Sequence, residues 1–416
     1  MAFNPLREKG IPLDKQFKNW DELNTKPYDK DRVHPYTRAR IILMNSIEAT
    51  AALFLHEFAR HTGDLDLKRM LGLARRVEQQ QQKTVNWMIP GNESDLELTL
   101  GYEQTAVDAT AYLAQIEPDI YFKQTFDFSL LDDFDHLYRF ANYLKVAEGK
   151  DAAPITKQYT EITVGRPTAL QHRHPFDDVV YNSNVQAHMP ASLLHLYTII
   201  ALEQQAMNFY MNIGNRPKDK LGRALYIEIA QMKEQHVSRY ESLTDPHLSW
   251  YGMFLLHEFN ECWLYYSFIH DETDPAVRSV WEQHLMIEIE HLRVASRLVE
   301  RYDGRDPAEL LPAKMTHLFK FRSNIDYIRE ILTSQIDLTA DGTILVPIDE
   351  LPGDHLYLSY QEQVNANGSP SETVVDALIL KTGNDYRYEI IGPHPVNMYR
   401  RQEAVAAVRK RIPRRT

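Results

Sequence analysis

The sequence is poor in cysteine and in positive charge. Cys262 is the only cysteine among 416 residues, so the chain can form neither an intrachain disulfide nor a cysteine-based metal site. This is typical of a reducing compartment, and we expect a cytoplasmic location. The formal net charge of −12 disfavours a protein that binds nucleic acid.

Long apolar runs are also missing. No segment approaches the roughly 18–20 apolar residues that span a bilayer, and the first residues contain no apolar core of a signal peptide. We therefore expect no membrane association. Hydrophobic residues nevertheless make up 44% of the chain and aromatic residues 11%, which is enough for a sizeable core.

Helical periodicity dominates the rest of the sequence. Apolar residues recur at i, i+3 and i+4 in two long regions, which predicts an all-α fold with a small mixed C-terminal segment. The expected divisions are an N-terminal arm at 1–33, a helical region at 34–147, a linker at 148–189, a second helical region at 190–303 and a C-terminal extension at 304–416. In the extension we expect a helix near 324–333, strands within 342–353 and 376–383, and a basic tail with seven Lys and Arg residues from Arg400 to Arg415.

The two helical regions resemble each other. They align without a gap at one constant offset, which matches Pro35 with Pro190, Glu48 with Glu203, Glu103 with Glu258 and His136 with His291. A constant offset over about a hundred residues favours an internal duplication of a helical unit.

One motif recurs within this frame. In the stretch MIEIEHLRV, Glu288 and His291 are three residues apart and share a helix face, and Glu258 precedes them in the neighbouring helical segment. A unit with the same intervals is intact in Glu103, Asp133 and His136, and incomplete in Glu48, Glu78 and Gln81 and in Glu203, Lys233 and His236. Each unit spans a helical hairpin, so one helix supplies a carboxylate and its neighbour a carboxylate and an imidazole.

Two such hairpins facing each other give four carboxylates and two imidazoles inside a four-helix bundle. This set could hold two metal ions bridged by carboxylates. Without thiolates, it suits iron or manganese better than structural zinc.

Over about residues 35–302, the chain resembles the ferritin-like superfamily of carboxylate-bridged di-metal proteins, whose signature is Glu…ExxH…Glu…ExxH. The resemblance implies duplicated ferritin-like four-helix-bundle repeats. It also implies a centre of two iron ions, or of two manganese ions, that activates dioxygen or peroxide.

The sequence leaves three pairings of the hairpins open: within each copy, across the long linker, or the second hairpin with the fourth. We favour the last, because it assembles a complete metal site from Glu103, Asp133, His136, Glu258, Glu288 and His291. A second group would then contain Glu48, Glu78, Gln81, Glu203, Lys233 and His236. In that group, the lysine ammonium would replace a metal charge among buried carboxylates.

Four further residues lie near this pattern. Glu261, three residues after Glu258, is either a further ligand or polar surface. His284 shares a helix face with Glu288 and could support the ligands, although we favour an exposed histidine there. Tyr265 and Tyr266 are expected in the core.

The expected function is a non-heme di-iron oxygenase or oxidase that acts on a small organic substrate with dioxygen. Its electrons would come from an external reductase or ferredoxin, because the sequence contains no GxGxxG or GKS nucleotide fingerprint. The alternative is a metal-poor ferritin-like scaffold subunit that binds protein partners through the arm and the basic tail. Self-association into a homo-oligomer is left open.

Overall fold

The computed structural model describes residues 3–180, 189–312, 317–403 and 405–406. Most of them are helical, and the predicted all-α class is confirmed. The long helices are α1 (Pro35–Arg60), α2 (Leu65–Asn86), α3 (Asp95–Ile116), α4 (Ile120–Ala147), α7 (Pro190–Ile213), α8 (Lys220–Glu241), α9 (Trp250–Asp271) and α10 (Pro275–Leu298). Most of the predicted basic tail, from 407 onward, lies outside the described residues.

The helices begin where the local sequence satisfies their free amides. Asp64, Asp119 and Asp274 accept backbone N–H groups at the starts of α2, α4 and α10. Ser94 and Glu97 form a reciprocal capping box at the start of α3. These caps fix the turns between paired helices.

The helix starts keep the spacing of the sequence pattern. Residues 35, 65, 95 and 120 begin the first four long helices, and 190, 220, 250 and 275 begin the second four. Each start in the second set follows its counterpart by the same offset that matches Pro35 with Pro190. Residues that the offset matches therefore lie at the same distance from the start of their helices.

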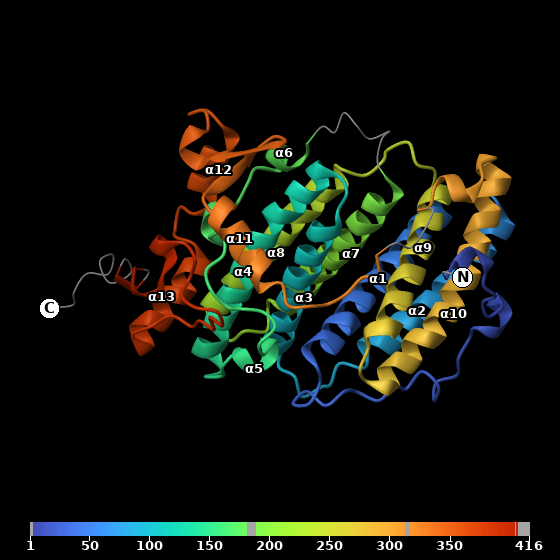
Figure 1. Ribbon diagram of the computed structural model, residues 1–416, viewed down its shortest axis with the longest axis horizontal. Coiled ribbons are helices and arrows are strands. Elements are labelled where there is room, and N and C mark those ends of the chain that lie inside the picture. The colour runs from blue at the N-terminus through green and yellow to red at the C-terminus, as the bar shows by residue number, and fades with distance from the viewer. Residues whose placement is uncertain (1–2, 181–188, 313–316, 404, 407–416) are drawn as a thin grey trace.

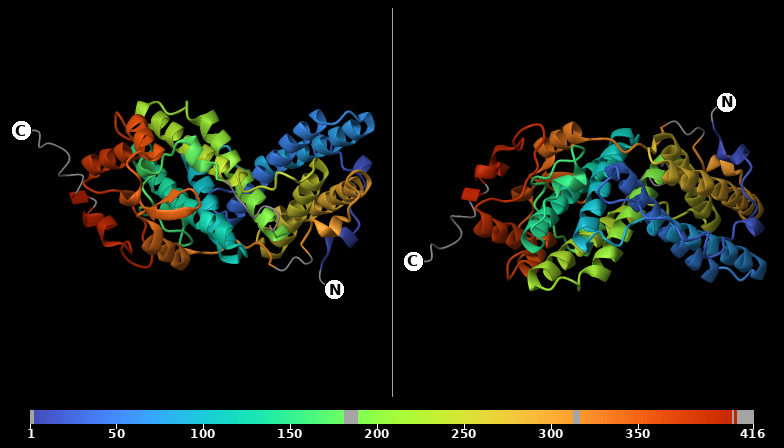
Figure 2. Two further views of the ribbon diagram at one scale, coloured as in Figure 1. Left: turned by 90° about the horizontal axis from the view of Figure 1, so that it is seen from above. Right: turned by 90° about the horizontal axis from the view of Figure 1, so that it is seen from below.

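The hairpins assemble into two four-helix bundles side by side (Figures 1 and 2). The first bundle consists of α1, α2, α9 and α10, and the second of α3, α4, α7 and α8. Aromatic contacts join the hairpins: Phe58 stacks on Trp250 at 5.8 Å between ring centroids, and Tyr102 stacks on Phe209 at 4.8 Å. Helix α1 also packs against α3 and α7, which joins the two bundles.

Among the described helices, α1 alone has the length and hydropathy of a membrane span, although Glu48 interrupts its apolar sequence. However, 72% of its most apolar window is buried inside the protein. This is typical of a core helix in a soluble protein.

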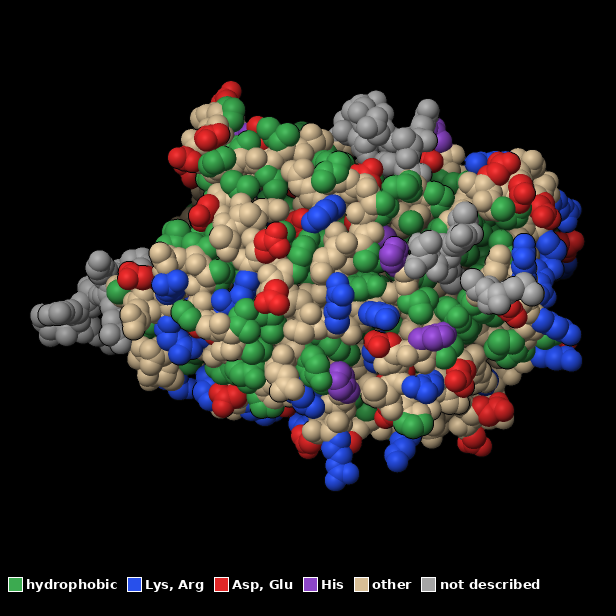
Figure 3. All heavy atoms as spheres, in the orientation of Figure 1, with side chains coloured by type: hydrophobic (Ala, Val, Ile, Leu, Met, Phe, Trp, Pro, Cys, Tyr) green, Lys and Arg blue, Asp and Glu red, His purple; other side chains and the backbone are tan. Residues whose placement is uncertain are grey.

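The charges on the surface are mixed. On the face drawn in Figure 3, acidic and basic side chains are interspersed with apolar and neutral ones, and several basic side chains gather along the right-hand edge. The negative net charge is therefore not concentrated on this face. The buried carboxylates described below, by contrast, are concentrated in the interior of the helical bundles.

The N-terminal arm follows the surface of the first bundle and contains two short 3₁₀ turns, Pro5–Arg7 and Leu13–Lys15. The backbone N–H of Ile11 donates to the Met286 carbonyl of α10 at 2.8 Å. Gly10 lies so close to α10 that a Cβ atom there would stand 2.5 Å from the Glu290 nitrogen. The arm therefore docks on α10 near the predicted ligands.

The C-terminal extension packs on the second bundle and lies at the far end from the N-terminal arm (Figure 1). It contains α11 (Ile325–Gln335), which confirms the predicted helix, the antiparallel strands β1 (Leu338–Asp341) and β2 (Ile344–Pro347), α12 (Leu356–Val364) and α13 (Pro370–Thr382). Strand β2 confirms the strand predicted within 342–353. The predicted strand at 376–383 is wrong, because Ser369 caps a helix there and Val374 and Leu378 are buried one turn apart.

Candidate metal centre

The six residues expected in one metal site lie in two different bundles. Glu258, Glu288 and His291 are in the first bundle, and Glu103, Asp133 and His136 are in the second. The predicted pairing of the second hairpin with the fourth is therefore wrong. The structure instead joins the second hairpin to the third, across the linker, and the first to the fourth, because the aromatic faces of α1 and α9 and of α3 and α7 fit together.

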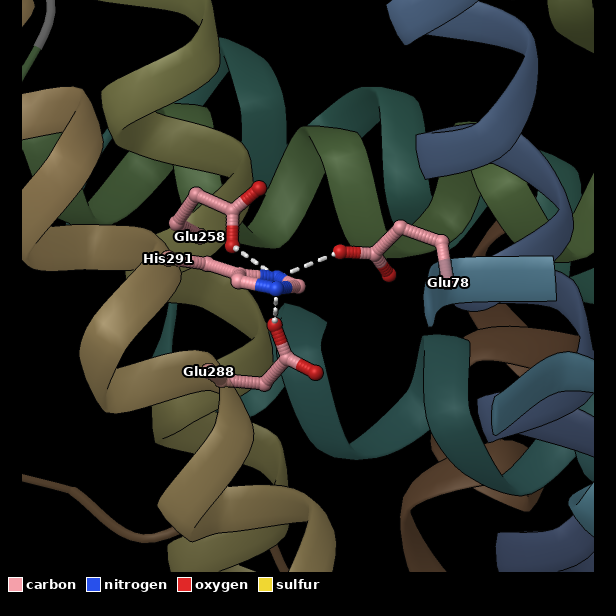
Figure 4. A group of neighbouring side chains, drawn as sticks. All are labelled: Glu78, Glu258, Glu288 and His291. Atoms are coloured by element: carbon pink, nitrogen blue, oxygen red, sulfur yellow. Dashed lines mark ion pairs between the residues drawn. The ribbon is translucent and has the colours of Figure 1, made fainter. Parts of the chain in front are cut away.

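The first bundle contains an acidic cluster, which we define as Glu48, Glu78, Glu258, Glu261, Glu288 and His291. None of these residues is more than 1% exposed. Three carboxylates from α2, α9 and α10 converge on the Nδ1 atom of His291 (Figure 4). The distances are 2.6 Å to Glu78 Oε1, 3.2 Å to Glu288 Oε2 and 3.6 Å to Glu258 Oε2.

The cluster contains two overlapping sets of potential ligands. Ligand atoms of Glu78, Glu258, Glu288 and His291 all lie within 4.8 Å of one another, and so do those of Glu48, Glu78, Glu261 and Glu288. Glu78 and Glu288 belong to both sets. Two neighbouring ion positions that share two carboxylates are therefore compatible with this geometry.

These carboxylates lack the partners that buried charges need. Within the described residues, no lysine or arginine forms an ion pair with any of the five. Apart from the ion pairs with His291, seven of their ten oxygen atoms, including both of Glu261, make no hydrogen bond within the described part of the chain. Buried carboxylates without such compensation are rare in folded proteins.

The local electrostatics reflect this shortage of positive charge. Burial raises the pKa of Glu48, Glu258 and Glu261, and the neighbouring charge of Glu78 raises all three further. Burial lowers the pKa of His291, but the charges of Glu288 and Glu78 outweigh it and give a net upward shift. In the absence of a cation, the cluster therefore retains protons.

The N-terminal arm orients His291. Oε1 of Gln16 lies 2.9 Å from Nε2 of His291, while the Gln16 amide nitrogen donates to the Ile11 carbonyl at 2.8 Å. Since the Gln16 oxygen can only accept, Nε2 carries a hydrogen. The Nδ1 atom then faces the carboxylates and is the atom available to a metal.

Polar groups complete one side of the cluster. Gln81, at the position where the motif expects a histidine, donates from Nε2 to Glu48 at 3.3 Å and also to Glu288. The Tyr265 hydroxyl donates to Glu48 and lies 2.9 Å from Nδ1 of His284. The core position of Tyr265 is confirmed, whereas Tyr266 is only partly buried. The expected exposure of His284 is wrong, because it is completely buried against Tyr265, and burial lowers its pKa to about 3.

The second bundle contains a lysine cluster, which we define as Glu103, Asp133, His136, Glu203, Lys233 and His236. Nζ of Lys233 lies 2.7 Å from Asp133, 3.2 Å from Glu103 and 3.2 Å from Glu203. The residues Glu48 and Glu78, expected beside this lysine, are in the other bundle. Lys233 does lie among buried carboxylates, as expected, but two of its partners, Glu103 and Asp133, differ from the expected ones.

A second cation strengthens this charge balance. His236 lies 3.3 Å from Asp132 and 3.4 Å from Glu203. Burial lowers the pKa of His236, but hydrogen bonds to these carboxylates outweigh it and raise the pKa to about 10. Ligand atoms of Glu103, Asp133 and His136, and of Asp133, Glu203 and His236, also lie within 4.8 Å of one another. Unlike the acidic cluster, however, these carboxylates already have the ammonium of Lys233 and the imidazolium of His236 as cationic partners.

The sequence pattern missed two features of the acidic cluster. Glu261 points into it as a fifth carboxylate, an alternative that its spacing from Glu258 had left open. Gln16 carried no signal, since it lies in the arm, outside every repeat. Comparison with protein-family models, curated proteins and solved structures gives no match to this chain.

Proposed function

We propose that the acidic cluster holds two metal ions, iron or else manganese, and that the protein is a non-heme di-iron oxygenase or oxidase. The observation that carries this proposal is the contrast between the bundles. Five fully buried carboxylates in the first bundle have no ammonium or guanidinium partner among the described residues, whereas Lys233 fills the equivalent place in the second.

The charges support two ions. The cost of burying one unpaired carboxylate is several kcal/mol, and the acidic cluster has five. Two divalent cations bring four positive charges, which nearly balances the cluster with His291 neutral. Oxygen and imidazole ligands without thiolate suit iron and manganese.

The overlapping ligand sets suggest which residue would hold each ion. Glu258 and His291 would hold one, Glu48 and Glu261 the other, and Glu78 and Glu288 both. When bound, a pair of ferrous ions would supply electrons for the reduction of dioxygen, and dioxygen would be the oxidant of the substrate. The chain's own residues orient and shield this centre: Gln16 fixes His291, Gln81 donates to the carboxylates, and apolar helices exclude water.

The wider assignment follows from the same features. Facing hairpins with carboxylates at matched depth are the arrangement of ferritin-like bundles, and the constant offset between the two sets of helix starts supports an origin by duplication. The substrate would be a small organic molecule, and a separate reductase or ferredoxin would supply electrons. The single cysteine supports a reducing, cytoplasmic compartment.

One observation favours a second candidate function for part of the molecule. The lysine cluster is balanced without metal, as expected of a ferritin-like scaffold that binds partners and carries out no chemistry. For the whole chain, we propose this scaffold role only as the alternative to the enzyme, because the carboxylates of the acidic cluster have no lysine or arginine partner among the described residues.

Metal analysis tests the proposal. Protein purified from an iron-supplemented culture should contain about two iron ions per chain, and the reduced protein should change its visible absorption when dioxygen is added. His291→Ala should lose at least the ion that His291 would hold. His136→Ala is the matched control, since it changes the equivalent histidine of the second bundle, and it should keep its iron. Less than one ion per chain in the wild type, or equal loss in both variants, would reject the metal centre.

A further inference from the structure

A separate cavity of about 270 Å³ lies where the end of α3 and the start of α7 meet α9. Ile116, Leu194, Phe259 and Trp263 provide apolar walls. The indole N–H of Trp263 donates to the His317 carbonyl at 2.8 Å, so its ring presents an apolar face. The cavity is large enough for a one-ring molecule, since an apolar cavity of about 150 Å³ can hold benzene.

His195 lines this apolar space and forms a buried polar pair with Glu117 behind it, and His317 is the other polar residue in the described lining. Nδ1 of His195 lies 2.6 Å from Oε2 of Glu117, and His195 lines the cavity. Glu117 is 8% exposed and His195 is 5% exposed. In a mostly apolar pocket, a small number of polar groups commonly fixes the orientation of a bound small molecule.

The hydrogen bonds of Glu117 determine how His195 can act. The carboxylate also accepts from the Ser192 hydroxyl at 2.5 Å and from the backbone N–H of Asp119 at 2.9 Å. Because the carboxylate is an acceptor for both of these groups and has no hydrogen of its own to donate, Nδ1 of His195 carries a hydrogen directed at Glu117. In the neutral ring, Nε2 is then an acceptor, and it has no hydrogen-bond partner among the residues that the structure describes.

We propose that this cavity is a binding site for a small apolar molecule with one hydroxyl group, which donates its hydrogen to Nε2 of His195. Glu117 holds the ring in the tautomer whose Nε2 accepts. Phe259 and Trp263 belong to α9, the helix that also carries Glu258 and Glu261, but they occupy a different helix face. The site therefore does not depend on the metal centre.

Two probes that differ only in a hydroxyl test this site. p-Cresol and toluene share a ring and a methyl group, and isothermal titration calorimetry on the full chain measures both. We expect p-cresol to bind about tenfold more tightly than toluene, the effect of one hydrogen bond. His195→Leu should weaken p-cresol by a similar factor and leave toluene within about twofold, because the apolar walls remain.

Two controls locate the binding event. Leu194→Trp fills the cavity and should abolish binding of both probes, while thermal unfolding of each variant checks that it folds. Glu117→Gln keeps the size of the side chain but allows its amide to donate to Nδ1, which would turn Nε2 into a donor and weaken p-cresol. Absence of p-cresol binding, equal affinity for both probes, or unchanged p-cresol affinity in His195→Leu would each overturn the proposal.

Discussion

Oε1 of Gln16 and Nε2 of His291 lie 2.9 Å apart, although 275 residues separate them in the chain. Gln16 belongs to the N-terminal arm and His291 to the acidic cluster of the first bundle. The arm therefore reaches from the surface to the second nitrogen of the one imidazole in this cluster. Its attachment to α2 is reinforced by Lys18, whose backbone N–H donates to Gln80 at 3.1 Å.

This contact predicts that the arm contributes to metal affinity. In Gln16→Leu, His291 loses the acceptor that keeps the hydrogen on Nε2, and metal affinity should fall roughly 10–100-fold. Competition with a chelator of known affinity measures it. Gln16→Glu should restore much of the affinity, since a carboxylate also accepts from Nε2. Lys15→Ala, at an exposed neighbouring position, should change nothing. Equal affinity in Gln16→Leu and the wild type would show that the arm has no such role.

A pair of variants separates the metal centre from the salt-bridged bundle. Glu288→Ala removes a carboxylate that belongs to both ligand sets, and it should abolish metal binding and any turnover. Lys233→Ala leaves Glu103, Asp133 and Glu203 buried without the ammonium, and it should lower the free energy of unfolding by about 3–5 kcal/mol with metal content unchanged. Urea unfolding and elemental analysis measure the two effects. If both variants only lower stability, the scaffold alternative gains support.

The sequence predicts much of this arrangement because the signals are local. Caps such as Asp64, Ser94 and Asp274 mark the helix starts, and the constant interval within each motif unit indicates that its members sit opposite each other in a hairpin. The pairing of the hairpins has no such local signal, because all four carry the same interval. It depends on aromatic contacts between α1 and α9 and between α3 and α7, whose residues are far apart in the chain.

The position of Gln16 also could not be predicted from the sequence. A single side chain in a segment rich in polar residues and prolines has no periodicity, and only the docking of Gly10 and Ile11 on α10 brings it to His291. Glu261 differs, because its spacing from Glu258 already placed it near the motif. What remained open for Glu261 was its direction, and in the structure it lies beside Glu48, Glu78 and Glu288.

The lysine cluster predicts a pH dependence of stability. The pKa of His236 is raised to about 10 in the folded protein, above the ordinary value of 6.5. The stabilisation from its imidazolium is therefore fully present below about pH 6.5 and is lost as the pH rises through about 10. Between pH 7 and 10, the wild type should lose at least about 1 kcal/mol more than His236→Gln. Urea unfolding at pH 7 and at pH 10 measures the free energy of unfolding of both proteins. Groups other than His236 contribute equally to both, so their contributions cancel in the difference. Parallel curves for the two proteins would contradict the assignment.

The last prediction concerns the division of ligands between the two ions. Glu261 belongs only to the set with Glu48, and Glu258 only to the set with His291. Glu261→Gln should therefore release one ion and keep the other, so that the iron content falls from about two to about one per chain. Glu258→Gln should also leave one ion, but the ion held by Glu48 and Glu261. Glu103→Gln, at the position equivalent to Glu258 in the second bundle, should keep both. Loss of both ions in Glu261→Gln would mean that the two positions fill only together, and no loss at all would remove Glu261 from the ligands.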